Sequence, residues 1–227
     1  MILRVPIGAY GSGGPYHSSS VESVVTNIRG LKIAYPSNGA DLKGLMKAAY
    51  HDPNPVVIFE HKGLYWSKVP GTKGATSIEP SEDYILPFGK AWVLNEIWKQ
   101  EQEETLSIIT YGMGVHWAMN AAAELGMKDR IEIVDLRTLH PLDYETVFAS
   151  VRKCGKCLVV TEEPSENSFA RALAGRIQEE CFKDLDGPVM VIGSENMPAI
   201  PLNSTLEQTM IPSTQKVKAK IEQLLDY

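Results

Sequence analysis

The chain has 227 residues, of which 44% are apolar and 22% charged, and 22 basic against 28 acidic side chains give a formal net charge of −6. This composition is typical of a globular chain of one or two domains and excludes wholesale disorder. The acidic balance argues against bulk binding of nucleic acid or anionic membranes. No stretch reaches the ~20 apolar residues of a membrane span, and the start of the chain lacks the pattern of a secretory signal.

Turn, helix and strand signals alternate in the first 60 residues. A short β-like run over residues 31–35 ends in a Pro-Ser-Asn-Gly turn, and residues 40–50 then place apolar side chains on one helical face. A breaker cluster at residues 51–55 precedes the apolar run of residues 56–59. This order predicts a β–α–β unit whose two strands are parallel.

A second alternation of strands and helices begins at about Gly89. The expected strands are residues 106–111, 130–134, 157–160 and 188–192, and the expected helices are 115–127, one starting at 141–143, 168–182 and 216–225. Strands separated by helices of this length predict an α/β fold with a mostly parallel sheet and helices on both faces.

The segment between these two parts lacks the alternation of strand and helix signals. Residues 62–87 contain repeated glycine and proline and show no sustained period. We therefore interpret residues 66–88 as a linker between two domains, residues 1–65 and residues 89–227.

The three cysteines include a pair with C-x-x-C spacing, Cys154 and Cys157. A zinc site would need a second ligand pair, which the sequence lacks, and an apolar run follows the second cysteine directly. We expect a turn that enters a buried strand. An odd number of thiols in a chain of this size suggests a reducing cytoplasm.

The segment from Gly11 to Glu22 carries the strongest candidate for chemistry. Three glycines free its backbone, Pro15 stiffens it, and the serines at 18–20 are expected to cap a helix with Glu22 reaching back. His17 would then lie on a rigid loop directly before a helix, and imidazole is the usual acid–base group near neutral pH. The residues alone leave a plain surface turn as the alternative, since one histidine is a weak signal.

Six segments follow one another in the order found in a known family. They are Gly14-Pro-Tyr-His-Ser-Ser-Ser-Val-Glu22, Gly30-Leu-Lys-Ile-Ala-Tyr-Pro-Ser37, Lys43-Gly-Leu45, Asp52-Pro-Asn-Pro-Val-Val-Ile-Phe-Glu60, Asp135-Leu-Arg-Thr138 and Pro141-Leu-Asp143. Together they resemble the beta-type chain of the thiamine-diphosphate-dependent 2-oxo acid dehydrogenases, over nearly the whole length. The resemblance implies that residues 1–65 are the C-terminal part of a transketolase-like pyrimidine-binding domain and that residues 89–227 are a transketolase C-terminal-like domain.

The resemblance also implies roles for a few residues. His17 matches the active-site histidine of the family's H-S-Q-S pattern, although Ser19 stands here in place of the glutamine. The segment matching Ala49, Asp52 and Asn54 forms in the family a structural potassium site built from backbone carbonyls. From the residues alone, a plain Asp-Pro-Asn-Pro turn remains open.

The family's cofactor is thiamine diphosphate with magnesium, activated by a glutamate that lies upstream of the matched region. No glutamate of this chain, Glu22 and Glu60 included, matches that motif. In the family the diphosphate and magnesium are held by an alpha-type chain or an upstream fused region. The resemblance therefore implies a portion of a longer beta-type or fused polypeptide, inactive by itself, that shares its cofactor with sequence outside this chain.

The implied reaction is oxidative decarboxylation of a 2-oxo acid with acyl transfer to a lipoyl group. The Pro15-Tyr-His17 segment favours the branched-chain branch. The implied partners are an alpha-type chain, a second copy of the C-terminal domain and a lipoyl acyltransferase core. Two alternatives stay open: an isolated assembly and docking fragment without activity of its own, and a transketolase-type ketol transferase.

The remaining polar groups are expected to be structural. Asp135 and Arg137 follow each other at a strand end and are expected to form an ion pair. Glu162 and Glu163 end a strand where ligands gather in open α/β sheets, but the resemblance places them at a subunit interface, so we expect anchoring. The other four histidines lack metal-like spacing and are assigned no ligand role: His51, His61, His116 and His140.

Overall fold

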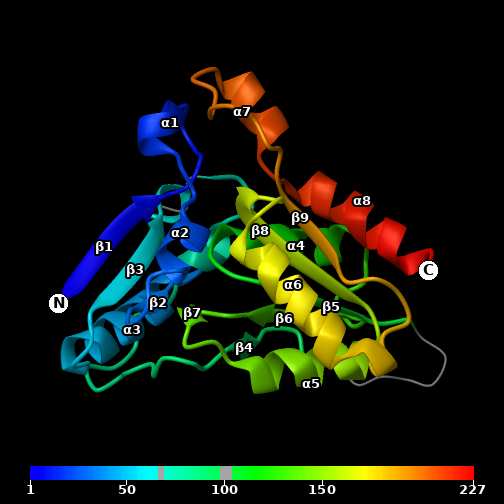
Figure 1. The fold of residues 1–227 in the computed structure, drawn as a ribbon, viewed down its shortest axis with the longest axis horizontal. Helices are drawn as coiled ribbons and strands as arrows, with labels where there is room; N and C mark the ends of the chain where they lie inside the picture. The colour runs from blue at the N-terminus through cyan, green and yellow to red at the C-terminus, as the bar shows by residue number, and fades with distance from the viewer. Residues whose placement is uncertain (66–68, 98–103) are drawn as a thin grey trace.

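A computed structural model describes residues 1–65, 69–97 and 104–227. Two β-sheets lie side by side in it, with helices packed against them (Figure 1). The first sheet has the strand order β1 (Ile2–Ile7), β3 (Val56–His61), β2 (Lys32–Ala34) and β7 (Thr138–His140). Strands β1, β3 and β2 are parallel, and α3 (Gly39–His51) connects β2 to β3, so the predicted β–α–β unit is confirmed.

The second sheet has the strand order β4 (Trp92–Val93), β6 (Ile131–Asp135), β5 (Leu106–Thr110), β8 (Cys157–Pro164) and β9 (Met190–Ser194). Four of these strands are parallel to their neighbours, and only the short β4 runs antiparallel, to β6. The mostly parallel sheet expected from the alternating pattern is therefore confirmed.

Helices cover both faces of the second sheet, as predicted. Helices α4 (Met113–Glu124) and α8 (Thr214–Leu225) pack on one face, in a cluster that contains Ile108 and Leu158 of the sheet. Helices α5 (Tyr144–Cys154) and α6 (Phe169–Glu180) pack with the opposite face, which contributes Ile109 and Val159. That second cluster also holds Tyr35, Val57 and Phe59 of the first half, so one core joins the two sheets.

Local signals explain where several helices start and stop. The side chains of Asn38, Asp143, Ser168 and Ser213 accept hydrogen bonds from the first-turn amides of α3, α5, α6 and α8. Gly155 ends α5 with a φ of +79°, a conformation that glycine adopts without strain. Cys154 closes α5 and Cys157 opens β8, both buried, which confirms the predicted turn into a buried strand.

Several elements were not predicted from the periodicity of the sequence. They are β1, β4, β7, the short helices α1 (Gly14–His17) and α7 (Ser204–Met210), and three 3-10 turns at Lys62–Leu64, Lys73–Ala75 and Phe182–Asp184. Strand β7 matters most, because it comes from the second half of the chain and completes the first sheet. None of the helices in the described ranges is long and apolar enough to cross a bilayer.

The segment interpreted as a linker packs against both halves where it is described: the Asn120 side chain of α4 donates to the Gly71 carbonyl at 3.0 Å. The Leu86 amide donates to the Gly44 carbonyl at 3.2 Å, and Tyr84 and Leu86 pack with the apolar face of α3. The start of the expected linker, residues 66–68, lies outside the described residues. The domain boundaries at 65 and 89 stay predictions.

Candidate functional site

His17 is the last residue of α1, a single helical turn that starts at Gly14, and its side chain is exposed. Helices α1 and α7 lie at the same end of the molecule (Figure 1). Gly14 has a φ of +61°, and a Cβ added there would lie 2.6 Å from Leu202 Cδ2, so the segment before α7 packs closely on α1. The predicted loop histidine is therefore carried on a short helix held against the second half of the chain.

Three buried carboxylates of the second half hold the segment that carries His17. Glu162 Oε1 accepts the Ala9 amide at 2.5 Å, and Glu207 accepts the Ser12 amide with both oxygens, at 3.1 and 3.2 Å. Glu163 accepts the Ser23 amide at 2.7 Å and also the Ser23 hydroxyl. We call Glu162, Glu163 and Glu207 the carboxylate clamp. It fixes the chain on both sides of His17, since charged acceptors make strong hydrogen bonds.

Glu162 of the carboxylate clamp also contacts a buried histidine, His61. Glu162 Oε2 lies 2.6 Å from His61 Nε2, and His61 Nδ1 accepts the Gly63 amide at 3.1 Å. Because Nδ1 is an acceptor, Nε2 carries the proton and donates it to the carboxylate. Anchoring by Glu162 and Glu163 was expected at a subunit interface, whereas in the structure both hold this chain's own N-terminal segment.

The predicted helix cap at Ser18–Ser20 is wrong. Helix α2 (Glu22–Thr26) starts after Val21, no side chain caps it, and Ser19 Oγ instead donates to the Pro15 carbonyl at 2.9 Å. Ser18 Oγ, Ser20 Oγ and both Glu22 carboxylate oxygens are buried and have no hydrogen-bond partner among the described residues. Burial, and then the charges of Glu163 and Glu162, raise the pKa of Glu22 well above its ordinary value.

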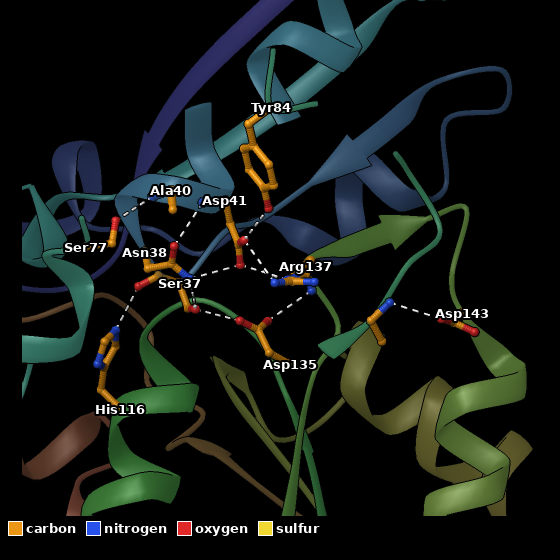
Figure 2. A network of polar contacts seen from close by, with 11 residues as sticks. Ser37, Asn38, Ala40, Asp41, Ser77, Tyr84, His116, Asp135, Arg137 and Asp143 are labelled. Atoms are coloured by element: carbon orange, nitrogen blue, oxygen red, sulfur yellow. Dashed lines mark hydrogen bonds and ion pairs between the residues drawn. The ribbon is translucent and has the colours of Figure 1, made fainter. Parts of the chain in front are cut away.

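The predicted ion pair between Asp135 and Arg137 is also wrong. Arg137 pairs with Asp41 instead, with Nε–Oδ2 at 2.8 Å and Nη2–Oδ1 at 3.0 Å (Figure 2). Arg137 has a φ of +57°, and its side chain crosses to the N-terminal turn of α3, 4.8 Å from the Trp92 ring centre. Asp135 accepts the Ser37 hydroxyl at 2.5 Å and the Arg137 amide at 3.0 Å.

The surroundings of Asp135 change its protonation. Complete burial raises the pKa of Asp135 to about 7, against the lowering effect of its hydrogen bonds from Ser37 and the Arg137 amide. His116 Nε2 lies 2.9 Å from the Ser37 carbonyl, and burial lowers the pKa of His116. These groups link α3, α4 and the β6–β7 turn (Figure 2), so this network joins the two halves.

Ala49, Asp52 and Asn54, which are predicted to hold potassium, belong to a turn with hydrogen bonds between its own residues. The Ala49 carbonyl accepts the Asp52 amide at 3.3 Å, and the Asp52 carboxylate accepts the Asn54 amide at 2.9 Å. Lys32 also pairs with Asp52, and its hydrogen bond lowers the pKa of that carboxyl. The Asp52 side chain is thus already engaged, and potassium bound through carbonyls there stays a proposal.

The surroundings of Glu60 and Glu22 bear on the cofactor site, which stays a prediction. Both oxygens of Glu60 bind Arg4, at 2.5 and 2.7 Å, and Glu22 is enclosed beside Glu163. The described ranges contain no group of three or more His, Cys, Asp or Glu residues suited to a metal ion. Which residues would hold magnesium and diphosphate stays a prediction.

Glu207 is the functional residue that the sequence did not reveal. Its carboxylate is buried at the start of α7, but the surrounding segment shows neither a sustained period nor a motif. Only the fold places it beside Ser12, 195 residues earlier in the chain.

Two family models match the chain. The model of the transketolase pyrimidine binding domain covers residues 1–67, and the model of the transketolase C-terminal domain covers residues 96–217. A solved structure of a split-gene transketolase, described as an inactive beta4 tetramer, superposes with a TM-score of 0.70 over 98% of this chain and 66% of that chain. Its sequence identity is 18%, so it supports the fold alone.

Curated relatives match with higher identity. The 2-oxoisovalerate dehydrogenase subunit beta of Bacillus subtilis is 41% identical over all of this chain and 66% of that subunit. The pyruvate dehydrogenase E1 component subunit beta of Rhizobium meliloti is 34% identical over 96% of this chain and 44% of that subunit. This chain thus spans about two thirds of the first relative and less than half of the second. It belongs to the transketolase C-terminal domain family, also matches the transketolase pyrimidine binding domain over residues 1–67, and is similar in sequence to beta subunits of 2-oxo acid dehydrogenases.

Proposed function

We propose that this chain is part of the beta-type chain of a 2-oxo acid dehydrogenase decarboxylating component. The observation that carries the proposal is His17, which is exposed at the end of α1 while buried carboxylates hold the chain on both sides of it. The identity to a 2-oxoisovalerate dehydrogenase beta subunit extends over the full chain and supports this assignment. A histidine that must meet a substrate in a shared site needs this combination of exposure and fixed position.

In this proposal the cofactor is thiamine diphosphate with magnesium, held mainly by polypeptide outside this chain. The cofactor acts as the electron sink for decarboxylation when bound. His17 contributes an imidazole that orients, or exchanges a proton with, the substrate carbonyl or the incoming lipoyl group. Backbone carbonyls of Ala49, Asp52 and Asn54 would hold a structural potassium ion, a hard cation suited to oxygen ligands.

The proposed partners follow from the incomplete site. An alpha-type chain or an upstream fused region would supply the cofactor cradle, and the C-terminal domain would bind a second copy and a lipoyl acyltransferase core. We assign the assembly to a reducing cytoplasm because Cys154, Cys157 and Cys181 are all buried thiols.

The proposed substrate is a branched-chain 2-oxo acid. The similarity supports this choice, since identity is 41% to a 2-oxoisovalerate dehydrogenase subunit and 34% to a pyruvate dehydrogenase subunit. An apolar pocket discriminates between substrates by only ~1–3 kcal/mol per methylene. A few side chains at the shared site would therefore determine whether a branched-chain 2-oxo acid or pyruvate is preferred.

One observation favours a second candidate function, an assembly module. The described ranges contain no group of three or more His, Cys, Asp or Glu residues suited to a metal ion, and Arg4 engages both oxygens of Glu60, so this segment by itself would bind partners without turning over substrate. Activity measured with and without partners separates the two candidate functions. The proposed enzyme part is inactive alone and active with its partners, whereas a docking module contributes no activity in either state.

The direct test is His17→Ala in the full assembly. We expect turnover to fall by roughly 10²-fold or more, the usual contribution of an acid–base group. His140→Ala is the matched control, because His140 is also exposed but lies on β7, outside the segments proposed to contact substrate or potassium. Unchanged turnover in the His17 variant would remove this residue from the mechanism.

A further inference from the structure

The residues that follow His17 form a helix-capping sequence that the structure leaves unused. Ser19-Ser-Val-Glu22 has the spacing of a capping box, in which the serine hydroxyl accepts the amide three residues on and the glutamate accepts the serine amide in return. Such a cap would start α2 at Ser20. In the structure α2 starts at Glu22, directly after Val21, and no side chain among the described residues caps it.

The polar atoms of the same segment are the ones that lack partners. Ser18 Oγ, Ser20 Oγ and both carboxylate oxygens of Glu22 are the only buried side-chain oxygen or nitrogen atoms in the described ranges without a hydrogen-bond partner. Folded proteins satisfy nearly all such atoms, and a buried group left unpaired costs free energy. The observed conformation of this segment is therefore less favourable than one in which these groups are paired.

Glu163 of the carboxylate clamp holds α2 in the observed conformation. It accepts the Ser23 amide at 2.7 Å and also the Ser23 hydroxyl, and its other oxygen accepts the Phe169 amide at 3.0 Å. The Ser23 amide would instead bond to the Ser19 carbonyl if α2 began at Ser20, because helical amides bond four residues back. Glu163 and the capping box therefore compete for the first turn of α2.

The hydroxyl that would cap α2 is engaged in α1. Ser19 Oγ donates to the Pro15 carbonyl at 2.9 Å, across the single turn that ends at His17. Capping α2 would turn this hydroxyl away from Pro15 and loosen that turn. Pro15 and the serines at 18–20 line a cavity of about 240 Å³, which gives room for the movement.

We infer that residues 18–23 form a conformational switch with two states. In the observed state, Glu163 holds Ser23 and α2 starts at Glu22. In the second state, α2 starts at Ser20, Ser19 Oγ accepts the Glu22 amide, and the Glu22 carboxyl accepts the Ser19 amide. This reciprocal bond needs no charge on Glu22, because glutamine also serves at this position of the motif.

The switch changes how firmly His17 is held. In the second state α2 is released from Glu163 and α1 loses its bond from Ser19, whereas Glu162 and Glu207 keep their hold on residues 9–12. The inference does not depend on the proposed function, because it rests on the hydrogen bonds of this segment alone.

Nuclear magnetic resonance of the folded chain tests the switch through the ¹³Cα chemical shift of Val21. In the observed state Val21 has φ −129° and ψ 23°, outside the helical range. In the second state Val21 lies inside α2 and should have a helical shift. We expect wild type to report both states at this residue, as two signals or as exchange between them.

Variants shift the balance in opposite directions. Ser23→Ala removes the hydroxyl bond to Glu163, which only the observed state makes, so the ratio of second to observed state should rise at least ~10-fold. Glu22→Ala removes the reciprocal partner of the second state, so Val21 should report the observed state alone. Val24→Ala is the matched control, because Val24 is exposed on α2 and helical in both states.

Shifts are compared after correction for the substituted neighbour. The control should keep the ratio found in wild type. The inference is overturned if the corrected shift of Val21 is the same in wild type, Ser23→Ala and Glu22→Ala, or if Glu22→Ala makes Val21 more helical.

Discussion

At the scale of single residues, the backbone conformation of Arg137 determines which carboxylate its guanidinium binds. Asp135 and Arg137 were expected to pair because they are two residues apart at a strand end. Arg137 has a positive φ, and its guanidinium binds Asp41, which is 96 positions away in the chain. A backbone conformation of this kind leaves no signature in the residue type, since arginine rarely adopts it.

Asp135 provides a pH test at this scale. Its pKa of about 7 lies above the ordinary value of 3.8, so between these values the folded state binds more protons than the unfolded state. Stability should therefore fall as the pH rises from about 4 to about 7, by roughly 4 kcal/mol from this group, and then level off.

Urea unfolding at pH 5 and pH 8 measures that contribution. Asp135→Asn should gain stability relative to wild type as the pH rises, whereas Asp129→Asn, an exposed control, should follow wild type. A constant free-energy difference between Asp135→Asn and wild type across this range would contradict the assigned protonation.

At the scale of elements, periodicity predicted the long helices and the buried strands. It missed β4 and β7, which span only two and three residues, whereas the equally short β2 lies within the longer β-like run of residues 31–35. It missed β1 because Arg4 and Pro6 interrupt the apolar pattern of an edge strand, and it missed α1 because Gly14 and Pro15 signal a turn. His17 was identified from its motif, but its place on α1 depends on packing against the segment before α7.

Glu207 tests the carboxylate clamp. Glu207→Ala removes the acceptor of the Ser12 amide, and a hydrogen bond to a charged group contributes about 1.5–3 kcal/mol. We expect hydrogen exchange of the amides in residues 10–17 to become at least ~10-fold faster, while the amides of β3 keep their protection.

Gln208→Ala is the control for this experiment, since Gln208 is the exposed neighbour on the same helix. If exchange near His17 is the same in wild type and Glu207→Ala, then packing of Leu202 on Gly14 holds the segment and the clamp does not.

At the scale of the whole molecule, an apolar core, the carboxylate clamp and the polar network around Asp135 and Arg137 join the halves in the described ranges. The core runs from Tyr35 and Phe59 of the first sheet to Ile109 and Val159 of the second, and β7 crosses from one half to the other. The sequence predicted an α/β architecture with a mostly parallel second sheet, which is confirmed. It did not predict the crossing strand, because pairing between distant segments is set by the tertiary fold.

The central claim is that this chain presents His17 to a thiamine diphosphate site completed by polypeptide outside it. Calorimetric titration of thiamine diphosphate with Mg²⁺ tests this most directly, first with the folded chain alone and then with the chain assembled with its alpha-type partner and upstream region. We predict no saturable binding by the lone chain and saturable binding by the assembly. Tight, saturable binding by the lone chain would contradict the claim.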